Sequence, residues 1–329
     1  MILELLETSV ASREQYDISD LIGGLTWFTS IDSQPGKLQF NFLDNRTVFL
    51  RAGDLLELKI DGKNIFKGKV FKRKKSLGNM WTITAYDSTR YLKNEDTLLF
   101  SANTASDRFK VICEAQGLPY AVLDKSTYKC TAVVENKHTY YAMLEDAITE
   151  TRTGSSQRYA FWDNFGKLEF FNLNRQITNL VIGDQSLMTD YDYEASIDDA
   201  ANSVKVLRED KDKGKREIYA EKDSSNIEKW GKLQVVETIS DADLNASQLR
   251  QLAKDLLRES NKESITVSVE ALSDTTIRAG KLFTWRNSEL TRDSIGGVKI
   301  GDDNLVLVTQ CTHNFDGVPR MSMEVEVIG

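Results

Sequence analysis

Proline, histidine and cysteine are all scarce in this sequence of 329 residues. The three prolines fall far below an average usage of about 5%, which excludes proline-rich linkers and collagen-like repeats. The three cysteines show no C-x-x-C spacing, so they provide neither a disulfide framework nor a thiolate zinc site. Two histidines cannot form a three-histidine metal centre. The sequence therefore excludes these kinds of site and predicts synthesis in a reducing cytoplasm.

Long apolar runs are also missing. No segment approaches the roughly 18 residues that a membrane helix needs, so we expect no membrane insertion by this chain. The first seven residues carry two acids and no basic side chain, and they do not resemble a secretory signal. The formal net charge of −8 gives no long-range attraction to nucleic acid.

The first 98 residues are predicted to form an antiparallel β domain. Apolar and polar residues alternate over 38–42 and again over 56–60, which is the period of a half-buried strand. Asp61-Gly62 follows the second segment directly and is a strong signal for a β-hairpin. Several short strands separated by turns favour a small barrel or a sandwich.

The period changes to that of helices in the section 99–200. Thr104, followed three residues later by Asp107, indicates the start of one helix. A second helix is expected over 139–152, and a hairpin follows it at 158–173. This section is predicted to be an α+β domain.

The last section, 201–329, returns to β structure. Strands are expected at 203–207 and 216–220. The leucines within 245–258 form the stripe of one long amphipathic helix. Further strands are expected towards the C-terminus, the last of them over 321–327.

An internal repeat connects the two β sections. Arg51-Ala52-Gly53-Asp54 aligns with Arg278-Ala279-Gly280-Lys281, and each segment leads into a predicted strand. A chance match of four residues is the alternative. The residues that define the repeat are Arg51, Gly53, Asp54, Arg278 and Gly280. The predicted fold is therefore α+β and mainly β, with two related small β-barrel domains, 1–98 and 201–329, flanking the α+β domain 99–200.

A cysteine nucleophile with a histidine base is the first catalytic arrangement to consider. Cys113 falls on the apolar face of a predicted helix, where a thiol behaves as a small hydrophobic side chain. Cys311 and His313 share one face of a predicted strand, but no nucleophile elbow surrounds them. We interpret the cysteines as structural and predict no catalytic residues.

Acidic side chains are densest between residues 190 and 199. Asp190, Asp192 and Glu194 alternate with tyrosines, and two further aspartates follow. A metal or glycosidase site needs carboxylates that converge in a cleft. The alternation is instead typical of a solvated strand or connector.

Basic side chains cluster on the hairpin predicted after residue 62. The cluster ends in Lys72, Arg73, Lys74 and Lys75. Exposed lysines also discourage aggregation at a sheet edge. We interpret the cluster as a solvated hairpin tip or a protein interface, and keep these four residues as candidates for a subunit contact or for the lining of a lumen.

Several short motifs follow one another in a specific order. They are Arg51-Ala52-Gly53-Asp54, Phe66-Lys67-Gly68-Lys69-Val70, Thr84-Ala85-Tyr86-Asp87, Asn202-Ser203-Val204-Lys205-Val206, Trp230-Gly231-Lys232-Leu233-Gln234, Arg278-Ala279-Gly280 and Met321-Ser322-Met323-Glu324. Over nearly the whole chain, this arrangement resembles the XkdQ/YqbQ-like baseplate hub proteins of contractile phage tails and phage-tail-like particles. Lys281 departs from the aspartate that the family often has there, so the side-chain hydrogen bonds of that turn are not carried over.

The resemblance implies a structural role in a virion or phage-tail-like particle, with no enzyme activity and no metal or cofactor. Such hubs are similar to homotrimers in which each subunit contributes two related β-barrel domains, so that three chains form a pseudo-sixfold ring. This ring would join a sixfold tail tube to a threefold central spike. The implied partners are further copies of the chain, the tail tube protein, the central spike and other baseplate proteins, with a tape-measure protein or DNA in the lumen. An appended cell-wall hydrolase, which some relatives carry, is not expected here.

Two other functions stay open on the sequence alone. A peptidoglycan-degrading, tail-associated enzyme would use paired acids, or Cys311 with His313. A carbohydrate-binding adhesion module would stack sugars on exposed Trp27, Trp81 or Trp162. These tryptophans alternate with polar residues, which favours positions in the core.

Overall fold

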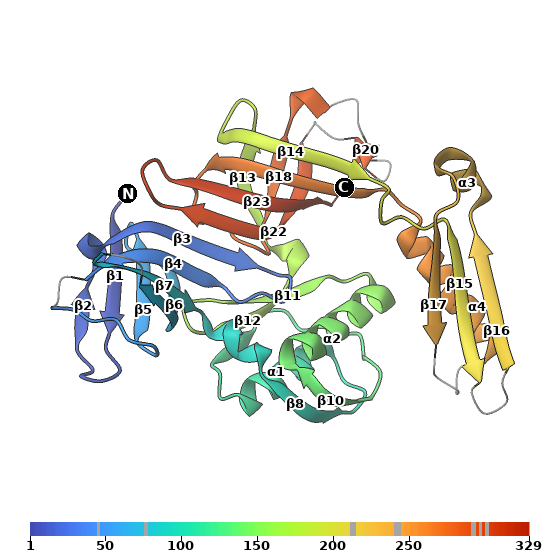
Figure 1. The fold of residues 1–329 in the computed structure, drawn as a ribbon, viewed down its shortest axis with the longest axis horizontal. Helices are drawn as coiled ribbons and strands as arrows, with labels where there is room; N and C mark the ends of the chain where they lie inside the picture. Colours follow the sequence, from blue (N-terminus) through green and yellow to red (C-terminus); the bar gives the residue numbers. More distant parts are fainter. Residues whose placement is uncertain are drawn as a thin grey trace. The chain divides into compact units, whose positions relative to one another are not determined.

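The computed structural model describes residues 1–44, 47–75, 78–210, 215–239, 245–290, 294–295, 298–299 and 303–328. The chain divides into two compact units: residues 1–191 with 268–329, and residues 192–267. Strands outnumber helices in the described residues, which confirms the mainly β class (Figure 1). No described helix has both the length and the apolar character that a membrane crossing requires.

One large sheet collects thirteen strands from both ends of the chain. Its strands are β1 (Leu3–Thr8), β2 (Gln15–Asp17), β3 (Ile22–Ser30), β4 (Lys37–Leu43), β5 (Leu55–Ile60), β6 (Lys63–Lys75), β7 (Met80–Tyr86), β13 (Ile177–Gly183), β14 (Met188–Ser196), β18 (Ser264–Leu272), β19 (Leu282–Arg286), β22 (Asn304–Asn314) and β23 (Arg320–Val327). The strand order is β14-β18-β23-β22-β3-β4-β7-β6-β5-β1-β2, and β19 pairs with both β22 and β13. We call β1 to β7 the N-terminal module and the other six strands the C-terminal module.

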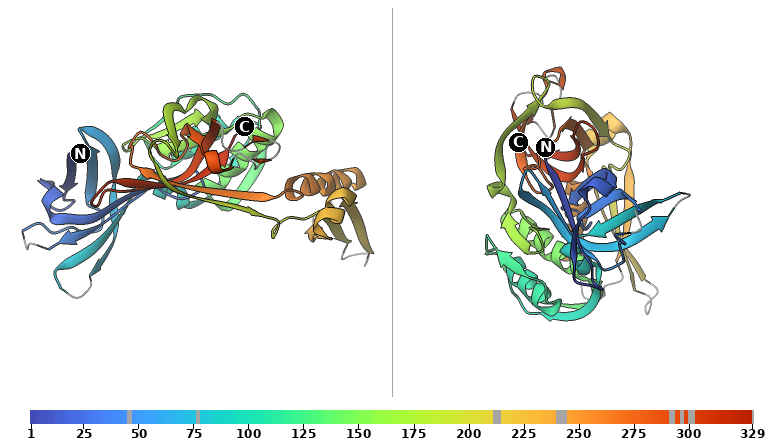
Figure 2. Two further views of the ribbon diagram at one scale, coloured as in Figure 1. Left: turned by 90° about the horizontal axis from the view of Figure 1, so that it is seen from above. Right: turned by 90° about the vertical axis from the view of Figure 1, so that its left-hand side faces the viewer.

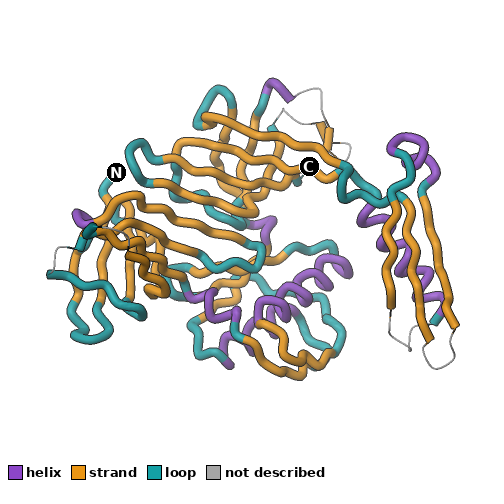
Figure 3. Tube along the Cα trace, in the orientation of Figure 1, coloured by secondary structure: helices purple, strands orange, loops and turns teal. Residues whose placement is uncertain are grey.

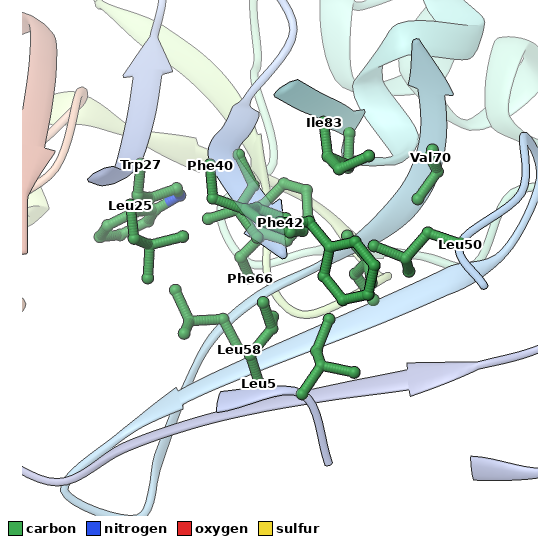
Figure 4. Close-up of a cluster of buried hydrophobic side chains, with 14 of the residues drawn as sticks. Leu5, Leu25, Trp27, Phe40, Phe42, Leu50, Leu58, Phe66, Val70 and Ile83 are labelled. Carbon is green, nitrogen blue, oxygen red and sulfur yellow. The ribbon is translucent and has the colours of Figure 1, made fainter. Parts of the chain in front are cut away.

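The N-terminal module follows the sequence pattern closely. The apolar residues of β4 are buried, and Figure 4 shows Phe40, Phe42 and Leu58 pointing into one hydrophobic cluster. Asp61 and Gly62 both have positive φ, 49° and 76°, as a two-residue hairpin turn with the favoured twist requires. The predicted hairpin between β5 and β6 is therefore confirmed.

Strand β22 joins the two modules. Its first residues pair with β19, and its last five, 310–314, pair antiparallel with β3. In the left view of Figure 2 the sheet passes from the blue N-terminal strands to the red C-terminal strands. The modules thus share one continuous sheet.

The residues between the modules form an α+β section with its own core. Helix α1 (Ala105–Ala115) starts after Thr104, whose side chain accepts a hydrogen bond from the Asp107 N–H, as predicted. Helix α2 (Tyr140–Ser155) covers the second predicted helix. Figure 3 shows both helices beside the short strands of this section. These strands are β8 (Glu95–Phe100), β9 (Tyr120–Val122), β10 (Val133–Thr139), β11 (Tyr159–Asp163) and β12 (Leu168–Asn172).

The second unit is a three-stranded sheet with helices. Its elements are β15 (Ser203–Asp210), β16 (Lys215–Lys222), α3 (Ser224–Trp230), β17 (Gln234–Ile239) and α4 (Ala246–Ser260). Helix α4 occupies the position of the predicted amphipathic helix, and its Leu249 and Ala253 pack on Val204 and Val206 of β15. A separate two-stranded ladder in the first unit pairs β20 (Ser294–Ile295) with β21 (Val298–Lys299).

The strand order corrects the expectation of two β-barrels. The path is open, with ends at β14 and β2, so the described strands close neither module into a barrel. The cause is β22, which leaves β19 and continues onto β3, so that the sheet extends into the next module. The strands expected at 203–207 and 216–220 also lie outside the large sheet, because β15 pairs with β16 and β17 instead. The three-domain division at residues 98 and 200 stays a prediction.

Candidate functional site

The first Arg-Ala-Gly turn is tied to β6 by two backbone hydrogen bonds. The Gly53 N–H donates to the Val70 carbonyl at 2.8 Å, and the Val70 N–H donates to the Asp54 carbonyl at 2.9 Å. The turn itself is closed by the Asp54 N–H, which donates to the Arg51 carbonyl at 3.2 Å. Gly53 has a φ of 94°, a region that glycine adopts without steric cost.

The second turn repeats this pattern bond for bond. The Gly280 N–H donates to the Val308 carbonyl at 2.8 Å, and the Val308 N–H donates to the Lys281 carbonyl at 2.9 Å. The Lys281 N–H donates to the Arg278 carbonyl at 3.1 Å, and Gly280 has a φ of 90°. The Arg-Ala-Gly sequence match therefore corresponds to one local structure built twice.

The equivalence extends into the strands that follow. The pairing of β6 with β7 skips one residue, Phe71, directly after Val70. The pairing of β22 with β23 skips one residue, Thr309, directly after Val308. A β-bulge bends its strand and increases the local twist. Because the bulges fall at equivalent positions, β5-β6-β7 and β19-β22-β23 are two copies of one three-stranded unit.

The side chains at the fourth position of the two turns differ. The buried Asp54 carboxylate accepts hydrogen bonds from the backbone N–H groups of Val10, at 2.9 Å, and Arg51. The half-buried Lys281 makes other contacts: its Nζ donates to Gln176 Oε1 at 2.8 Å and lies 5.0 Å from the centre of the Trp162 ring. The backbone turn is thus kept without the aspartate.

Asp54 has an acidic neighbour in Glu7 of β1. The side chain of Glu7 is buried, and among the described residues its Oε1 has no hydrogen-bond partner. Burial, together with the charge of Asp54, raises the pKa of Glu7 to about 7. Glu7 is therefore a carboxyl group that the fold keeps protonated up to about pH 7.

The arginines of the two turns have different surroundings. Arg278 Nη1 donates to the Asp163 carbonyl at 2.9 Å, and its guanidinium lies 4.9 Å from the centre of the Trp162 ring. Arg51 is exposed and lies over the ring of Phe49. The Arg278 side chain is therefore docked against the α+β section, whereas the Arg51 side chain is exposed to solvent.

Two buried carboxyl groups lie around Arg278. Asp87 accepts a hydrogen bond from the Thr89 N–H at 3.0 Å, and Asp163 accepts one from the Gly166 N–H at 2.6 Å. Burial raises the pKa of both carboxyl groups. Because Asp87 and Asp163 accept hydrogen bonds from nearby backbone N–H groups, they stabilise turns close to Arg278.

The four candidate residues 72–75 lie together on the second part of β6. Arg73 donates to the Leu50 carbonyl, and its guanidinium lies 5.0 Å from the Phe49 ring centre. Lys75 lies over Trp81, whereas Lys72 and Lys74 are exposed on the opposite face. The pairing of β6 with β5 ends before this segment, at residue 69.

The structure does bring Cys311 and His313 together. Their Sγ and Nε2 atoms are 3.3 Å apart, and both residues are buried. His313 Nε2 also lies 2.8 Å from the Ile277 carbonyl, which can only accept, so this nitrogen carries the proton and cannot serve as a base. Burial raises the pKa of the Cys311 thiol and lowers that of His313 to about 4. The pair has the properties of packed core side chains.

The other candidates from the sequence are separate from one another. Trp27 is buried and stacks on His313 with ring centres 5.1 Å apart, while Trp81 and Trp162 are half-buried. Asp192 and Glu194 lie exposed on β14. Within the part of the chain that the structure describes, no three His, Cys, Asp or Glu side chains are grouped as a metal site.

Comparison with solved structures identifies the fold. The 43 kDa tail protein of prophage MuSo2 from Shewanella oneidensis superposes with a TM-score of 0.69 at 12% identity, covering 98% of both chains. A tail protein from Neisseria meningitidis MC58 also gives 0.69, at 13% identity, covering 100% of this chain and 98% of the other. The Escherichia coli c3393 protein, a type VI secretion component similar to the T4 tail proteins gp27 and gp5, gives 0.53 at 10% identity over 94% of this chain and 74% of its own.

Comparison of sequences identifies the family. YqbQ of Bacillus subtilis, strain 168, an uncharacterized protein, is 32% identical over 67% of this chain and 66% of its own length. XkdQ of the phage-like element PBSX of the same strain is 32% identical over 63% of each chain. The matches therefore span slightly less than two thirds of these relatives. The model of the YQBQ-like family matches residues 25–326, and the chain belongs to that family.

Proposed function

We propose that this protein is a structural baseplate hub of a phage tail or a related injection particle. Three copies form a ring in which six similar modules alternate, two from each chain. The ring joins a sixfold tail tube to a threefold central spike, and it is part of the assembled particle. The chain acts by binding other proteins and carries out no chemical step.

The single observation that carries this proposal is the duplicated turn and bulge. Gly53 and Gly280 close the same turn, and the bulges after Val70 and Val308 bend the strands at the same place. A chain that contains one module twice can present six equivalent surfaces as a trimer, which reconciles threefold and sixfold neighbours. The repeat survives even though the sheet does not close into barrels.

The comparisons support the same class of function. The PBSX relative belongs to a phage-like element, and the Shewanella and Neisseria proteins with this fold are tail proteins. We infer from them that the partners are a tube protein, a central spike and other baseplate proteins. A tape-measure protein or DNA would then pass through the lumen of the ring.

The peptidoglycan-degrading alternative has less support from the geometry. The Nε2 proton of His313 is directed to the Ile277 carbonyl, so no base is positioned for the Cys311 thiol. The carbohydrate-binding alternative would need exposed aromatic faces, and Trp27 is 3% exposed.

Light scattering of the purified protein over a range of concentrations tests the proposal. We expect a species with the mass of three 37.2 kDa chains, which dissociates on dilution. A protein that stays monomeric at its highest soluble concentration would contradict the proposal. A hexamer would also contradict it, because six chains would not need an internal repeat to form a sixfold ring.

A further inference from the structure

We propose that the acidic strand β14 of one copy of this chain pairs, antiparallel, with the second part of β6 of the next copy. The inference rests on the proposed trimer, and it names the two strands that hold neighbouring copies together. It also gives a role to the two charged stretches that the fold leaves on exposed strands.

The contact between modules within one chain provides the template. Beyond its bulge, β22 is paired by β3: the Ile31 N–H donates to the Thr309 carbonyl at 3.0 Å, and Thr312 lies opposite Phe28. The equivalent part of β6 is residues 71–75. Among the described residues, no strand pairs with β6 on that side after Lys69. The N-terminal module therefore has an open edge at the place where the C-terminal module holds a strand.

The strand that corresponds to β3 in the C-terminal module is β14. In the sheet order, β3 lies next to β4, which lies next to β7. In the same way, β14 lies next to β18, which lies next to β23, the equivalent of β7. The outer edge of β3 is covered by β22, whereas β14 is the end of the order. In the described part of the chain, β14 is thus a strand with an open edge, and β6 after Lys69 is an edge that can receive it.

The exposed faces of β6 and β14 correspond to the outward faces of β22 and β3. Lys72 and Lys74 are equivalent to the outward-facing Gln310 and Thr312 of β22, because both pairs follow the bulge in the same register. On β14 the exposed acids alternate with the half-buried Tyr191 and Tyr193, as Phe28 alternates with the buried Trp27 on β3. Pairing on the template of β22 and β3 therefore places the lysines and the acids on the same face.

Charge complementarity identifies a second copy as the occupant. Lys72 and Lys74 would meet Asp192 and Glu194 across the shared edge, where opposite charges stabilise cross-strand pairs and fix the partner. An edge strand supplies an unpaired row of backbone N–H and C=O groups, so the main chain adds hydrogen bonds to this contact. Repeating the contact around a ring requires no other partner.

Cross-linking of the full chain tests the pairing directly. A chain with Lys74→Cys and Asp192→Cys is treated with a short bis-maleimide at a concentration where the wild type is trimeric. The native cysteines are all buried and are not expected to react. We expect covalent dimers and trimers on a denaturing gel, and none from either single variant. Phe28→Cys with Thr312→Cys is the matched positive control, since these residues are opposite each other within one chain.

Charge reversal provides the second measurement. Lys72→Glu with Lys74→Glu is expected to raise the trimer dissociation concentration by about tenfold or more, and Asp192→Lys with Glu194→Lys should do the same. All four substitutions in one chain should restore the wild-type value. Lys222→Glu with Lys229→Glu, two exposed lysines in the second unit, should leave that concentration unchanged.

The outcomes separate this inference from the proposed function. If the wild type is trimeric but the chain with Lys74→Cys and Asp192→Cys gives no cross-link, the pairing of β14 with β6 is overturned and the trimeric hub stands. The pairing is also overturned if a charge-reversed variant keeps the trimer dissociation concentration of the wild type. It is overturned as well if the chain with all four substitutions dissociates as readily as the charge-reversed variants. A wild type that is monomeric at every concentration would contradict both.

Discussion

Each copy of the duplicated turn depends on one glycine. Gly53 and Gly280 have φ values of 94° and 90°, where a side chain beyond glycine strains the backbone. A Cβ on Gly53 would meet only Val10, at 3.6 Å, whereas a Cβ on Gly280 would lie 3.2 Å from Phe171 and 3.3 Å from Trp162. The same backbone is thus more tightly enclosed in the second copy than in the first.

Substituting the two glycines by alanine measures this difference. We expect Gly53→Ala to lower the free energy of unfolding by about 1–2 kcal/mol through backbone strain, and Gly280→Ala to lower it further through the close contacts. Gly23→Ala is the control, because a Cβ there meets no atom within 4 Å and its φ is not positive. Urea denaturation followed by circular dichroism gives the values. Equal losses at all three positions would show that the turns have no special conformational requirement.

Glu7 makes the stability of the N-terminal module depend on pH. Its pKa rises from 4.5 to about 7 on folding, so the folded chain keeps a proton that the unfolded chain releases in that range. The free energy of unfolding should therefore fall by about 2–3 kcal/mol as the pH rises from 4.5 to 7. Glu7→Gln should remove this part of the slope.

Urea denaturation at several pH values between these limits measures the slope. Glu270→Gln, a change of an exposed glutamate on β18, should leave the slope of the wild type intact. If the free energy of unfolding depends on pH equally in Glu7→Gln and the wild type, the pKa of Glu7 is not raised in the folded chain.

At the scale of elements, local signals predicted structure well. The Asp61-Gly62 hairpin forms because both residues accept positive φ, and α1 starts where Thr104 caps it. These features depend on a few neighbouring residues, so the sequence pattern is sufficient to find them. The alternation over 38–42 also predicted which side chains of β4 are buried.

Local sequence patterns could not predict which distant strands pair with each other. Alternation shows which face of a strand is buried, but it does not show which strand lies beside it. The last part of β22 pairs with β3, almost three hundred residues earlier in the chain, and the sequence around His313 contains no sign of this. For the same reason the sequence showed neither that the large sheet stays open nor that β15 pairs with β16 and β17 outside it.

The candidate site was predictable to a similar extent. The Arg-Ala-Gly match predicted the two equivalent turns, since a short motif with glycine at one position encodes local backbone geometry. The burial of Arg278 against Trp162 and Asp163 could not be predicted, because it depends on how the α+β section packs. The matching bulges could not be predicted either, because the skipped residues, Phe71 and Thr309, are of different types.

The N-terminal boundary of helix α4 can be tested with a single substitution. The Asn245 side chain accepts hydrogen bonds from the Ser247 and Gln248 N–H groups, and Gln248 Oε1 accepts one from the Asn245 N–H, which completes a capping box. Asn245→Ala should destabilise the helix by about 1 kcal/mol, because these N–H groups lose their partners. Faster hydrogen exchange in the first turn of α4 would report the loss. Ser247→Ala, at an exposed position in the same turn, should not produce it.

At the scale of the whole molecule, the account depends on one module occurring twice in one chain. The turns, the bulges and the three strands around them repeat between β5-β6-β7 and β19-β22-β23. In the proposed ring of six, two modules joined edge to edge by β22 and β3 would be one third of the circle. Repeating the same edge contact between chains would complete that ring without a second kind of interface.

Averaged electron images of the purified assembly, viewed down its axis, measure this directly. The account predicts a closed ring with six similar densities around a central opening, built from three chains according to the mass of the same sample. A ring of three densities, a ring of six chains, or particles without a closed ring would contradict it.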